Sequence, residues 1–306
     1  MTITAKPSPD SLAILLLTAS TNRASGEGAQ PLAPGEYSAL AARLTEREMW
    51  PSDLLSGDVN VAELLAGITT IDAARVHELL QRRAALGPLL DRVRAAGLWL
   101  ITRADAAYPE RLTRVLGSKA PSLLYGAGPQ TLLATNEGIG VVGSRNLDDE
   151  GASFARLVGK TAAGDGCVLV SGGAQGADET AMRAALAAGG ATIGVLGQDL
   201  ARELANNNWR DAIAAERCVL VSAVSPWAGF NASNLMARNK YVYGLSSVVF
   251  VAASDVKGGT WAGAVENQRH GWTPLYVRDG EGAGSKTPAG NRELIAAHGA
   301  AAFAAA

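Results

Sequence analysis

Three glycine-containing segments in the second half of the sequence carry residue types that bind anions. The first is Val142-Gly143-Ser144-Arg145, which follows a short apolar run. Glycine lets the backbone approach a ligand, serine offers a hydroxyl donor, and arginine can hold a phosphate with two parallel N–H groups. The segment does not follow the GxGxxG pattern, so it gives little support to a dinucleotide site. A plain turn with a solvated arginine is the alternative interpretation.

The second segment, residues 171–178, lies between a predicted strand and a predicted helix. Its backbone N–H groups and the positive end of the helix dipole would point at one place, which favours an anion site. The Gly-Lys-Ser/Thr ending of a P-loop is missing, and Asp178 is an alternative helix cap. The candidate binding residues are Ser171, Gly172, Gly173, Gln175, Gly176 and Asp178.

The third segment is Lys257-Gly258-Gly259-Thr260, again directly before a predicted helix. Backbone amides at Gly258 and Gly259 and the hydroxyl of Thr260 can hold a phosphate, although Thr260 is also a typical helix cap. A fourth element, Arg238-Asn239-Lys240, places two cations in the helix before the last long predicted strand. We expect Arg145, Arg238 and Lys240 to contact separate phosphates; a solvated helix face is the alternative for the last two.

Groups that perform chemistry are not evident at these loops. The three histidines lie elsewhere, and the sequence shows neither a serine nucleophile elbow nor spaced metal ligands. We therefore predict a binding protein without catalytic residues, cofactor or metal. Glu266, on the helix after the third segment, is the one candidate acid, and a solvated position is its alternative.

The pattern around these loops predicts an α/β fold. From Gly138 onward, short apolar runs alternate with helical segments, which is typical of a doubly wound, mostly parallel sheet with helices on both faces. In such a sheet, ligands bind beyond the carboxyl ends of the strands. The predicted strands are residues 98–101, one strand within residues 120–126, and residues 139–142, 168–171, 192–196, 219–221 and 248–251.

The first part of the chain differs in pattern. Apolar residues recur at helical spacing up to about residue 95, including the run from Leu12 to Leu17. We predict two domains, a helical domain over residues 1–96 and an α/β domain over residues 97–306.

Composition sets further limits on the function. Of the 306 residues, 48% are apolar and 18% charged, which allows a sizeable core. The formal net charge of −2 means that any nucleic-acid site must be a local basic pocket. Cys167 and Cys218 lie in apolar runs and are predicted to be buried. No apolar run reaches a membrane-spanning length, so we expect a cytoplasmic protein without a membrane partner.

Together, these motifs resemble the DprA/Smf family of DNA-processing proteins, in the right order over roughly residues 98–300. The motifs that carry the resemblance are Asp105-x-x-Tyr108-Pro109-x-x-Leu112, Pro121-x-Leu123-Leu124-Tyr125, Val142-Gly143-Ser144-Arg145, Ser171-Gly172-Gly173-Ala174-x-Gly176-Ala177-Asp178, Gly189-Gly190-x-Thr192-Ile193-x-Val195-Leu196-Gly197 and Arg238-Asn239-Lys240-x-x-x-Gly244-Leu245-Ser246.

The resemblance implies an extended Rossmann-like domain that binds single-stranded DNA and helps to load the RecA recombinase during natural transformation. It also implies that the strand is held by Ser144 and Arg145, by Gly172, Gly173 and Gln175, and by Arg238, Asn239 and Lys240. The sequence departs from the family at Gln175, where a cation is usual, at Met182, where a histidine is usual, and at Ala253, where a glutamate is typical.

Two alternatives stay open. Gly258-Gly259-Thr260 with Glu266 is similar to the loop of LOG-type nucleotide phosphoribohydrolases, although the proline of that loop is missing. A non-catalytic sensor of a free nucleotide in signalling or defence would suit the acidic balance and Gln175. The sequence leaves the oligomeric state, including a homodimer, undecided.

Overall fold

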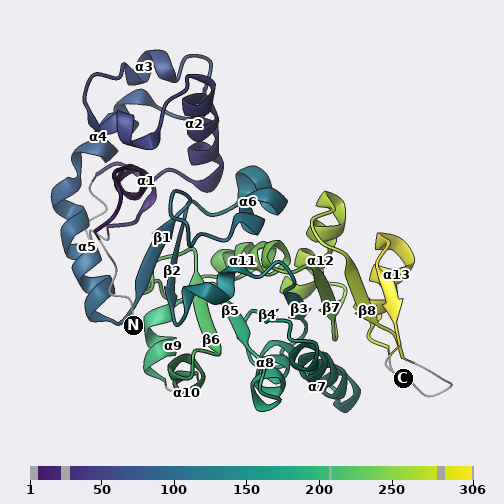
Figure 1. The fold of residues 1–306 in the computed structure, drawn as a ribbon. Helices are drawn as coiled ribbons and strands as arrows, with labels where there is room; N and C mark the ends of the chain where they lie inside the picture. The colour runs from purple at the N-terminus through teal and green to yellow at the C-terminus, as the bar shows by residue number, and fades with distance from the viewer. Residues whose placement is uncertain (1–5, 22–27, 207–208, 281–286, 305–306) are drawn as a thin grey trace. The chain divides into compact units, whose positions relative to one another are not determined.

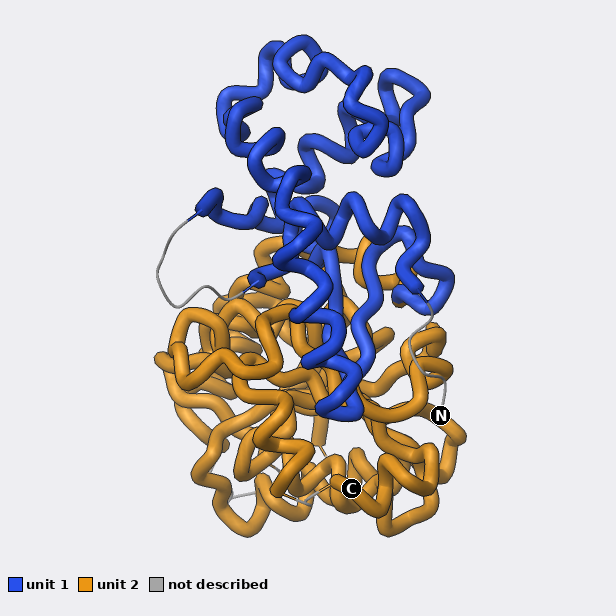
Figure 2. Tube along the Cα trace, turned by 90° about the vertical axis from the view of Figure 1, so that its left-hand side faces the viewer, with its two compact units in different colours: residues 1–108, 117–126 blue, residues 109–116, 127–306 orange. Residues whose placement is uncertain are grey.

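The computed structural model describes residues 6–21, 28–206, 209–280 and 287–304 (Figure 1). The chain divides into two compact units, which Figure 2 shows in different colours. Unit 1 comprises residues 1–108 and 117–126, and unit 2 comprises residues 109–116 and 127–306.

Unit 1 is mainly helical. Its central helix, α1 (Pro9–Thr18), begins at an N-cap where the side chain of Ser8 accepts a hydrogen bond from the backbone N–H of Ser11. The consecutive residues 13–17 of this helix are all buried, so other elements surround it on every side. These elements include α2 (Pro34–Glu46), α4 (Ala73–Gln81), α5 (Arg83–Ala95) and the 3₁₀ helix η1 (Pro51–Leu55); α3 (Val61–Leu64) packs on α4.

Unit 1 also contains an antiparallel pair of strands, β1 (Trp99–Thr102) and most of β2 (Leu123–Ala127), in a register that places Trp99 opposite Gly126. A short 3₁₀ helix, η2 (Gly117–Lys119), precedes β2. Both strands lie where the sequence predicted them. The boundary predicted at residue 96 separates this pair from the helices, whereas the division into compact units keeps the pair with them.

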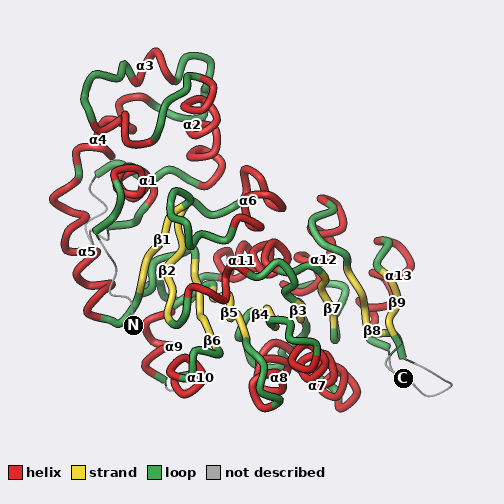
Figure 3. Tube along the Cα trace, viewed as in Figure 1, coloured by secondary structure: helices red, strands yellow, loops and turns green. Residues whose placement is uncertain are grey.

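Unit 2 is built on a parallel sheet in the strand order β6-β5-β4-β3-β7-β8-β9. Each described pairing between these neighbours is parallel, as predicted. Figure 3 shows the strands in yellow, with the helices in red beside them. The strands are β3 (Ile139–Val142), β4 (Leu169–Ser171), β5 (Thr192–Leu196), β6 (Cys218–Ser222), β7 (Val248–Val251), β8 (Leu275–Arg278) and β9 (Ala301–Phe303).

Helices cover both faces of this sheet. In Figure 1, α7 and α8 lie on one side of the strands and α11 and α12 on the other, and each pair packs together. This arrangement confirms the predicted doubly wound α/β fold. The helices are α6 (Glu110–Leu116), the 3₁₀ helix η3 (Gln130–Ala134), α7 (Asp149–Gly164), α8 (Ala177–Ala187), α9 (Leu200–Ala205), α10 (Arg210–Ala214), α11 (Ala232–Leu245), α12 (Gly259–His270) and α13 (Ala289–His298).

The strand order fixes where a ligand can bind. The chain runs outward from β3 through β4, β5 and β6, then returns to place β7 on the other side of β3. The connections after β3 and β7 therefore leave toward opposite faces, and the carboxyl ends of these two strands flank an open crevice.

Two further expectations can be compared with the structure. Cys218 is buried in β6 as predicted, but Cys167 is only half-buried, because it lies in the turn before β4 rather than in the strand itself. Among the helices of the described residues, none combines the length and the apolar character needed to cross a bilayer.

Candidate functional site

A cavity of about 410 Å³ opens at the crevice between β3 and β7, entirely within unit 2. Four segments line it: the loop after β3, the loop after β4 with the first turn of α8, one face of α11, and the loop after β7 with the first turn of α12. The lining residues are Val142, Gly143, Ser144, Arg145, Ala174, Asp178, Ala232, Leu235, Met236, Arg238, Asn239, Tyr243, Ser254, Asp255, Lys257, Gly258, Gly259 and Thr260.

The loop after β3 is fixed at its base and exposed at its tip. The backbone N–H of Ser144 donates to the carbonyl of Ala253 (2.8 Å), which ties this loop to the end of β7. A Cβ at Gly143 would lie 2.6 Å from the Cβ of Ala177, so only glycine allows this approach. The side chain of Arg145 is exposed, and no hydrogen bond or ion pair within the described residues holds its guanidinium. The loop therefore presents a cation that is available to an anion.

The loop after β4 lies against the loop after β3, because β3 and β4 are neighbouring parallel strands. The backbone N–H of Ala177 donates to the carbonyl of Ser144 (3.2 Å), and Gly176 has a φ of +96°, where glycine is favoured. Ser171 is fully buried, and its hydroxyl donates to the carbonyl of Val141 (2.6 Å). Ser171 thus joins β4 to β3. It does not line the cavity, whereas the sequence predicted that its side chain binds phosphate.

Of the other predicted residues of this segment, only Asp178 lines the cavity. Gly172, Gly173, Gln175 and Gly176 do not line it, whereas Ala174 and Asp178 do. A Cβ at Gly172 would overlap the Nη1 atom of Arg238. The glycine is therefore needed to accommodate the arginine side chain.

Asp178 and Arg238 form a buried ion pair. The Arg238 Nη1 atom lies 3.6 Å from the Asp178 Oδ2 atom, and each side chain is only 9% exposed. Burial raises the pKa of the Asp178 carboxyl, which the positive charge of Arg238 opposes. Asp178 does not cap its helix, because Gly176 occupies the N-cap and Asp178 follows one residue after the first helical position.

Arg238 retains a donor that the ion pair does not use. Its Nε atom is buried and has no hydrogen-bond partner within the described residues, although the side chain lines the cavity. Burial lowers the pKa of this guanidinium, and Asp178 opposes that effect. A buried donor without an acceptor is unfavourable, so this atom lowers the stability of the unliganded fold.

The loop after β7 leads directly into α12. Gly258 is the N-cap of this helix with a φ of +94°, and the side-chain amide of Asn239 donates to the carbonyl of Gly259 (2.8 Å). Asn239 therefore holds the start of α12 against α11. Thr260 is the second helical residue instead of the cap, and Lys257 is exposed at the rim. The first turn of a helix has N–H groups without intrahelical acceptors, and here Gly258, Gly259 and Thr260 line the cavity, so their N–H groups are candidate donors to an anion.

Lys240 and Glu266 lie outside the cavity lining. The Nζ atom of Lys240 lies 5.3 Å from the ring centroid of Tyr241. The cavity thus unites the first and third predicted segments with Asp178, Arg238 and Asn239, but not with Lys240.

Sequence reasoning missed the apolar floor of the cavity. Leu235, Asn239 and Tyr243 follow one another at intervals of four residues, so they lie on one face of α11. The same helical spacing could have linked Leu235 and Tyr243 to the predicted Asn239. Met236 lines the cavity as well and is 48% exposed. The site therefore combines cationic and amide donors with an apolar surface.

The chain is similar in sequence to a family of DNA-processing proteins. A family model described as "DNA recombination-mediator protein A" matches residues 99–306. The chain is 30% identical over 189 residues to the DNA processing protein DprA of Bacillus subtilis, which covers 61% of this chain and 63% of that protein. It is 34% identical over 158 residues to the DprA of Streptococcus pneumoniae, and this match covers 51% of this chain and 54% of that protein. The chain spans less than two thirds of the length of these curated relatives.

Two solved structures are similar in fold. The X-ray structure of DprA from Streptococcus pneumoniae superimposes with a TM-score of 0.67 at 23% identity, covering 90% of this chain and 95% of that one. A structure of DprA from Helicobacter pylori, described in terms of its single-stranded DNA binding mode, gives a TM-score of 0.55 at 25% identity. This match covers 67% of this chain and 90% of that chain.

Proposed function

Because the chain belongs to the DNA recombination-mediator protein A family, we propose that it is a DNA-processing protein that binds the phosphate backbone of single-stranded DNA in the cavity between β3 and β7. It acts by holding a strand and not by catalysing a reaction on it. The predicted RecA-type recombinase is the partner that would receive this strand.

The exposed guanidinium of Arg145 carries the proposal. It lines the same cavity as the first turn of α12 and the exposed Lys257. Phosphodiester groups suit such a site, because arginine and backbone amides both donate hydrogen bonds to phosphate oxygens without reading the base. Leu235 and Met236 add an apolar surface that an unpaired nucleotide can contact.

The relatives support the same ligand class. The curated matches carry the names DNA processing protein DprA and Smf, and the Helicobacter pylori structure is described in terms of single-stranded DNA binding. The proposal extends these descriptions to this chain because its cavity carries an uncompensated cation and open amides.

Titration of a fluorescently labelled oligothymidylate with the purified protein tests the function. We expect saturable binding that unlabelled single strands displace and that a duplex of the same length displaces far less well. Preference for a free mononucleotide over the oligonucleotide would contradict the proposal and favour the nucleotide-sensing alternative. A recombinase assay on strands coated with single-strand-binding protein then tests the partner.

The phosphoribohydrolase alternative receives no support from the geometry. Glu266, the acid on which that similarity depends, does not line the cavity. We expect the purified protein to release no free base from AMP. Release of base that is lost in Glu266→Ala would overturn the binding-only assignment.

A further inference from the structure

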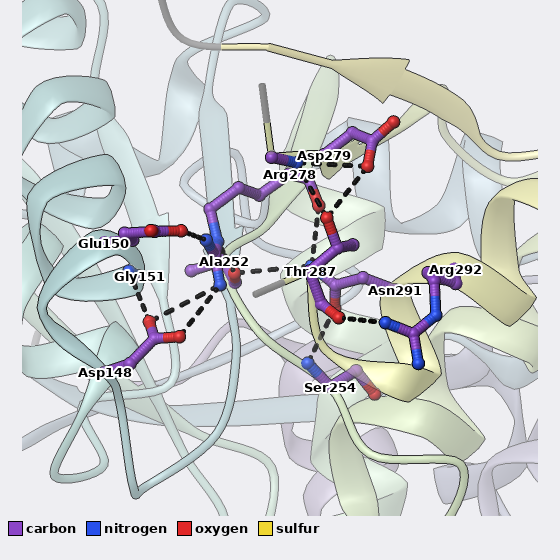
Figure 4. Close-up of polar contacts among 11 residues, drawn as sticks. Asp148, Glu150, Gly151, Ala252, Ser254, Arg278, Asp279, Thr287, Asn291 and Arg292 are labelled. Atoms are coloured by element: carbon purple, nitrogen blue, oxygen red, sulfur yellow. Dashed lines mark hydrogen bonds and ion pairs between the residues drawn. The ribbon is translucent and has the colours of Figure 1, made fainter. Parts of the chain in front are cut away.

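A buried arginine outside the cavity ties together the two loops that carry its anion-binding groups. Arg278 is the last residue of β8, and its side chain is 4% exposed. Its Nε atom donates to the carbonyl of Ala252 (2.8 Å), its Nη1 atom to the carboxylate of Glu150 (3.0 Å) and its Nη2 atom to that of Asp148 (3.4 Å). Figure 4 shows the guanidinium between these three partners. All of them belong to unit 2, and none lines the cavity.

On one side, Arg278 holds the far end of the loop after β3. Asp148 is the N-cap of α7 and accepts a hydrogen bond from the backbone N–H of Gly151 (2.6 Å). Residues 143–148 connect β3 to this cap and include Arg145. The near end of the loop is fixed by Ser144, whose N–H donates to Ala253. Arg278 thereby fixes the second end of the segment that carries Arg145.

On the other side, Arg278 and Asn291 hold the start of the loop after β7. Asn291 is fully buried; its Oδ1 atom accepts from the N–H of Ser254 (2.8 Å), and its Nδ2 atom donates to the carbonyl of Arg278 (2.8 Å). The N–H of Gly290 donates to the carbonyl of Ser254 (3.0 Å), and a Cβ at Gly290 would overlap the carbonyl of Asp255. The first residues of this loop are thus locked onto α13.

We propose that Arg278 is a positioning residue, which sets the spacing between Arg145 and the amides at the start of α12. The inference rests on the proposed function, since that spacing matters for a ligand that both loops contact. Three partners in three directions require the planar, forked guanidinium, and lysine offers only one point charge. Two of the partners lie at the start of α7, where the helix dipole also favours carboxylates.

A double-mutant cycle separates positioning from a general contribution to stability. We expect Arg278→Met to weaken oligothymidylate binding about five-fold, which corresponds to about 1 kcal/mol of coupling. In an Arg145→Ala background the same change should cost little, because the group that Arg278 positions is already gone. Arg278→Lys should fall between the parent and Arg278→Met. Equal losses in both backgrounds, or no loss in a folded Arg278→Met variant, would overturn the proposal.

Glu150→Ala provides a second variant in case Arg278→Met fails to fold. The Glu150 side chain is 52% exposed and does not cap α7, so its removal leaves the buried arginine with Asp148 and Ala252. We expect a smaller loss of binding that again disappears in the Arg145→Ala background. Glu179→Ala is the matched control, because it removes one partner of an ion pair along α8, with Arg183, and neither residue lines the cavity. A loss in Glu179→Ala equal to that in Glu150→Ala would count against the proposal.

Hydrogen exchange without DNA distinguishes failure of this inference from failure of the proposed function. In Arg278→Met, the amides of Ser144 and Ser254 should exchange faster than in the parent, while core amides such as that of Ile193 keep their protection. If the parent does not bind DNA but this exchange pattern appears, the proposed ligand is wrong and the positioning role stands. Unchanged protection at both serines would contradict the positioning role whatever the ligand.

Discussion

The guanidinium of Arg238 lies 3.6 Å from the carboxylate of Asp178, with both side chains 9% exposed, and both residues line the candidate DNA-binding cavity. This relationship changes how the cavity is understood. The buried Arg238 is already paired with the acid Asp178, so the exposed Arg145 and Lys257 become the main groups for attracting a strand. The Nε atom of Arg238 is buried and has no hydrogen-bond partner within the described residues.

We predict that Asp178→Asn destabilises the protein by about 3–5 kcal/mol, because it leaves Arg238 buried without a counter-charge. Chemical denaturation followed by circular dichroism measures the change. The double variant Asp178→Asn/Arg238→Met should regain much of this loss. An Asp178→Asn protein with the denaturation midpoint of the parent would show that the pair does not contribute in this way.

Gly172→Ala should cost about 1–3 kcal/mol of unfolding free energy, because the new methyl group would overlap the guanidinium of Arg238. The matched control is Gly164→Ala, since a Cβ at Gly164 meets nothing within 4 Å. Thermal melting of the two variants side by side gives the comparison. Equal melting temperatures would mean that Arg238 does not occupy the space above Gly172.

The affinity for oligothymidylate should fall with salt. A plot of the logarithm of the binding constant against the logarithm of the salt concentration should have a slope of about −0.7 for each phosphate that is neutralised. Two exposed cations line the cavity, Arg145 and Lys257, so we expect a slope of about −1.4. Lys257→Ala should reduce the slope to about −0.7. A slope near −2 would support a third cation, as we expected from the sequence with Arg238 and Lys240, and a slope of zero would argue against phosphate contacts.

The strands and the loop positions could be predicted from the sequence because they depend on local signals. Thr192–Leu196 and Val248–Val251 are short apolar runs between turn residues, and the structure contains both. The sequence did not predict β9 (Ala301–Phe303), because alanine favours helices. There, pairing with β8 and ring contacts of Phe303 with Phe154, Phe250 and Tyr276 stabilise a strand.

The chemistry of individual site residues was harder to predict. Ser171, Asp178 and Arg238 all looked like ligand-binding groups, because each lies at a loop or helix that reaches the sheet edge. The structure shows that Ser171 and Asp178 are partly or wholly engaged by other protein groups. Such pairings join residues that are distant in sequence, so spacing and composition do not reveal them. The cluster around Arg278 escaped sequence reasoning for the same reason.

The two cysteines should differ in reactivity. Burial raises the pKa of the Cys218 thiol to about 11, so at pH 8 this thiol is almost entirely protonated in the folded protein. Cys167 is half-buried, and its pKa is also raised. We expect iodoacetamide to label Cys167 slowly and Cys218 only after denaturation, as peptide mass spectrometry would show. Rapid labelling of native Cys218 would contradict its place inside the parallel sheet.

The most direct test of the central claim is the affinity of Arg145→Ala for labelled oligothymidylate. A charge-assisted hydrogen bond contributes about 1.5–3 kcal/mol, so this variant should bind about ten-fold more weakly or worse while melting at the temperature of the parent. Arg145→Lys should recover part of the loss, because lysine keeps the charge without the fork. Arg83→Ala, which removes an exposed arginine of α5, should bind like the parent. If Arg145→Ala retains the affinity and melting temperature of the parent, the strand does not bind in the cavity between β3 and β7.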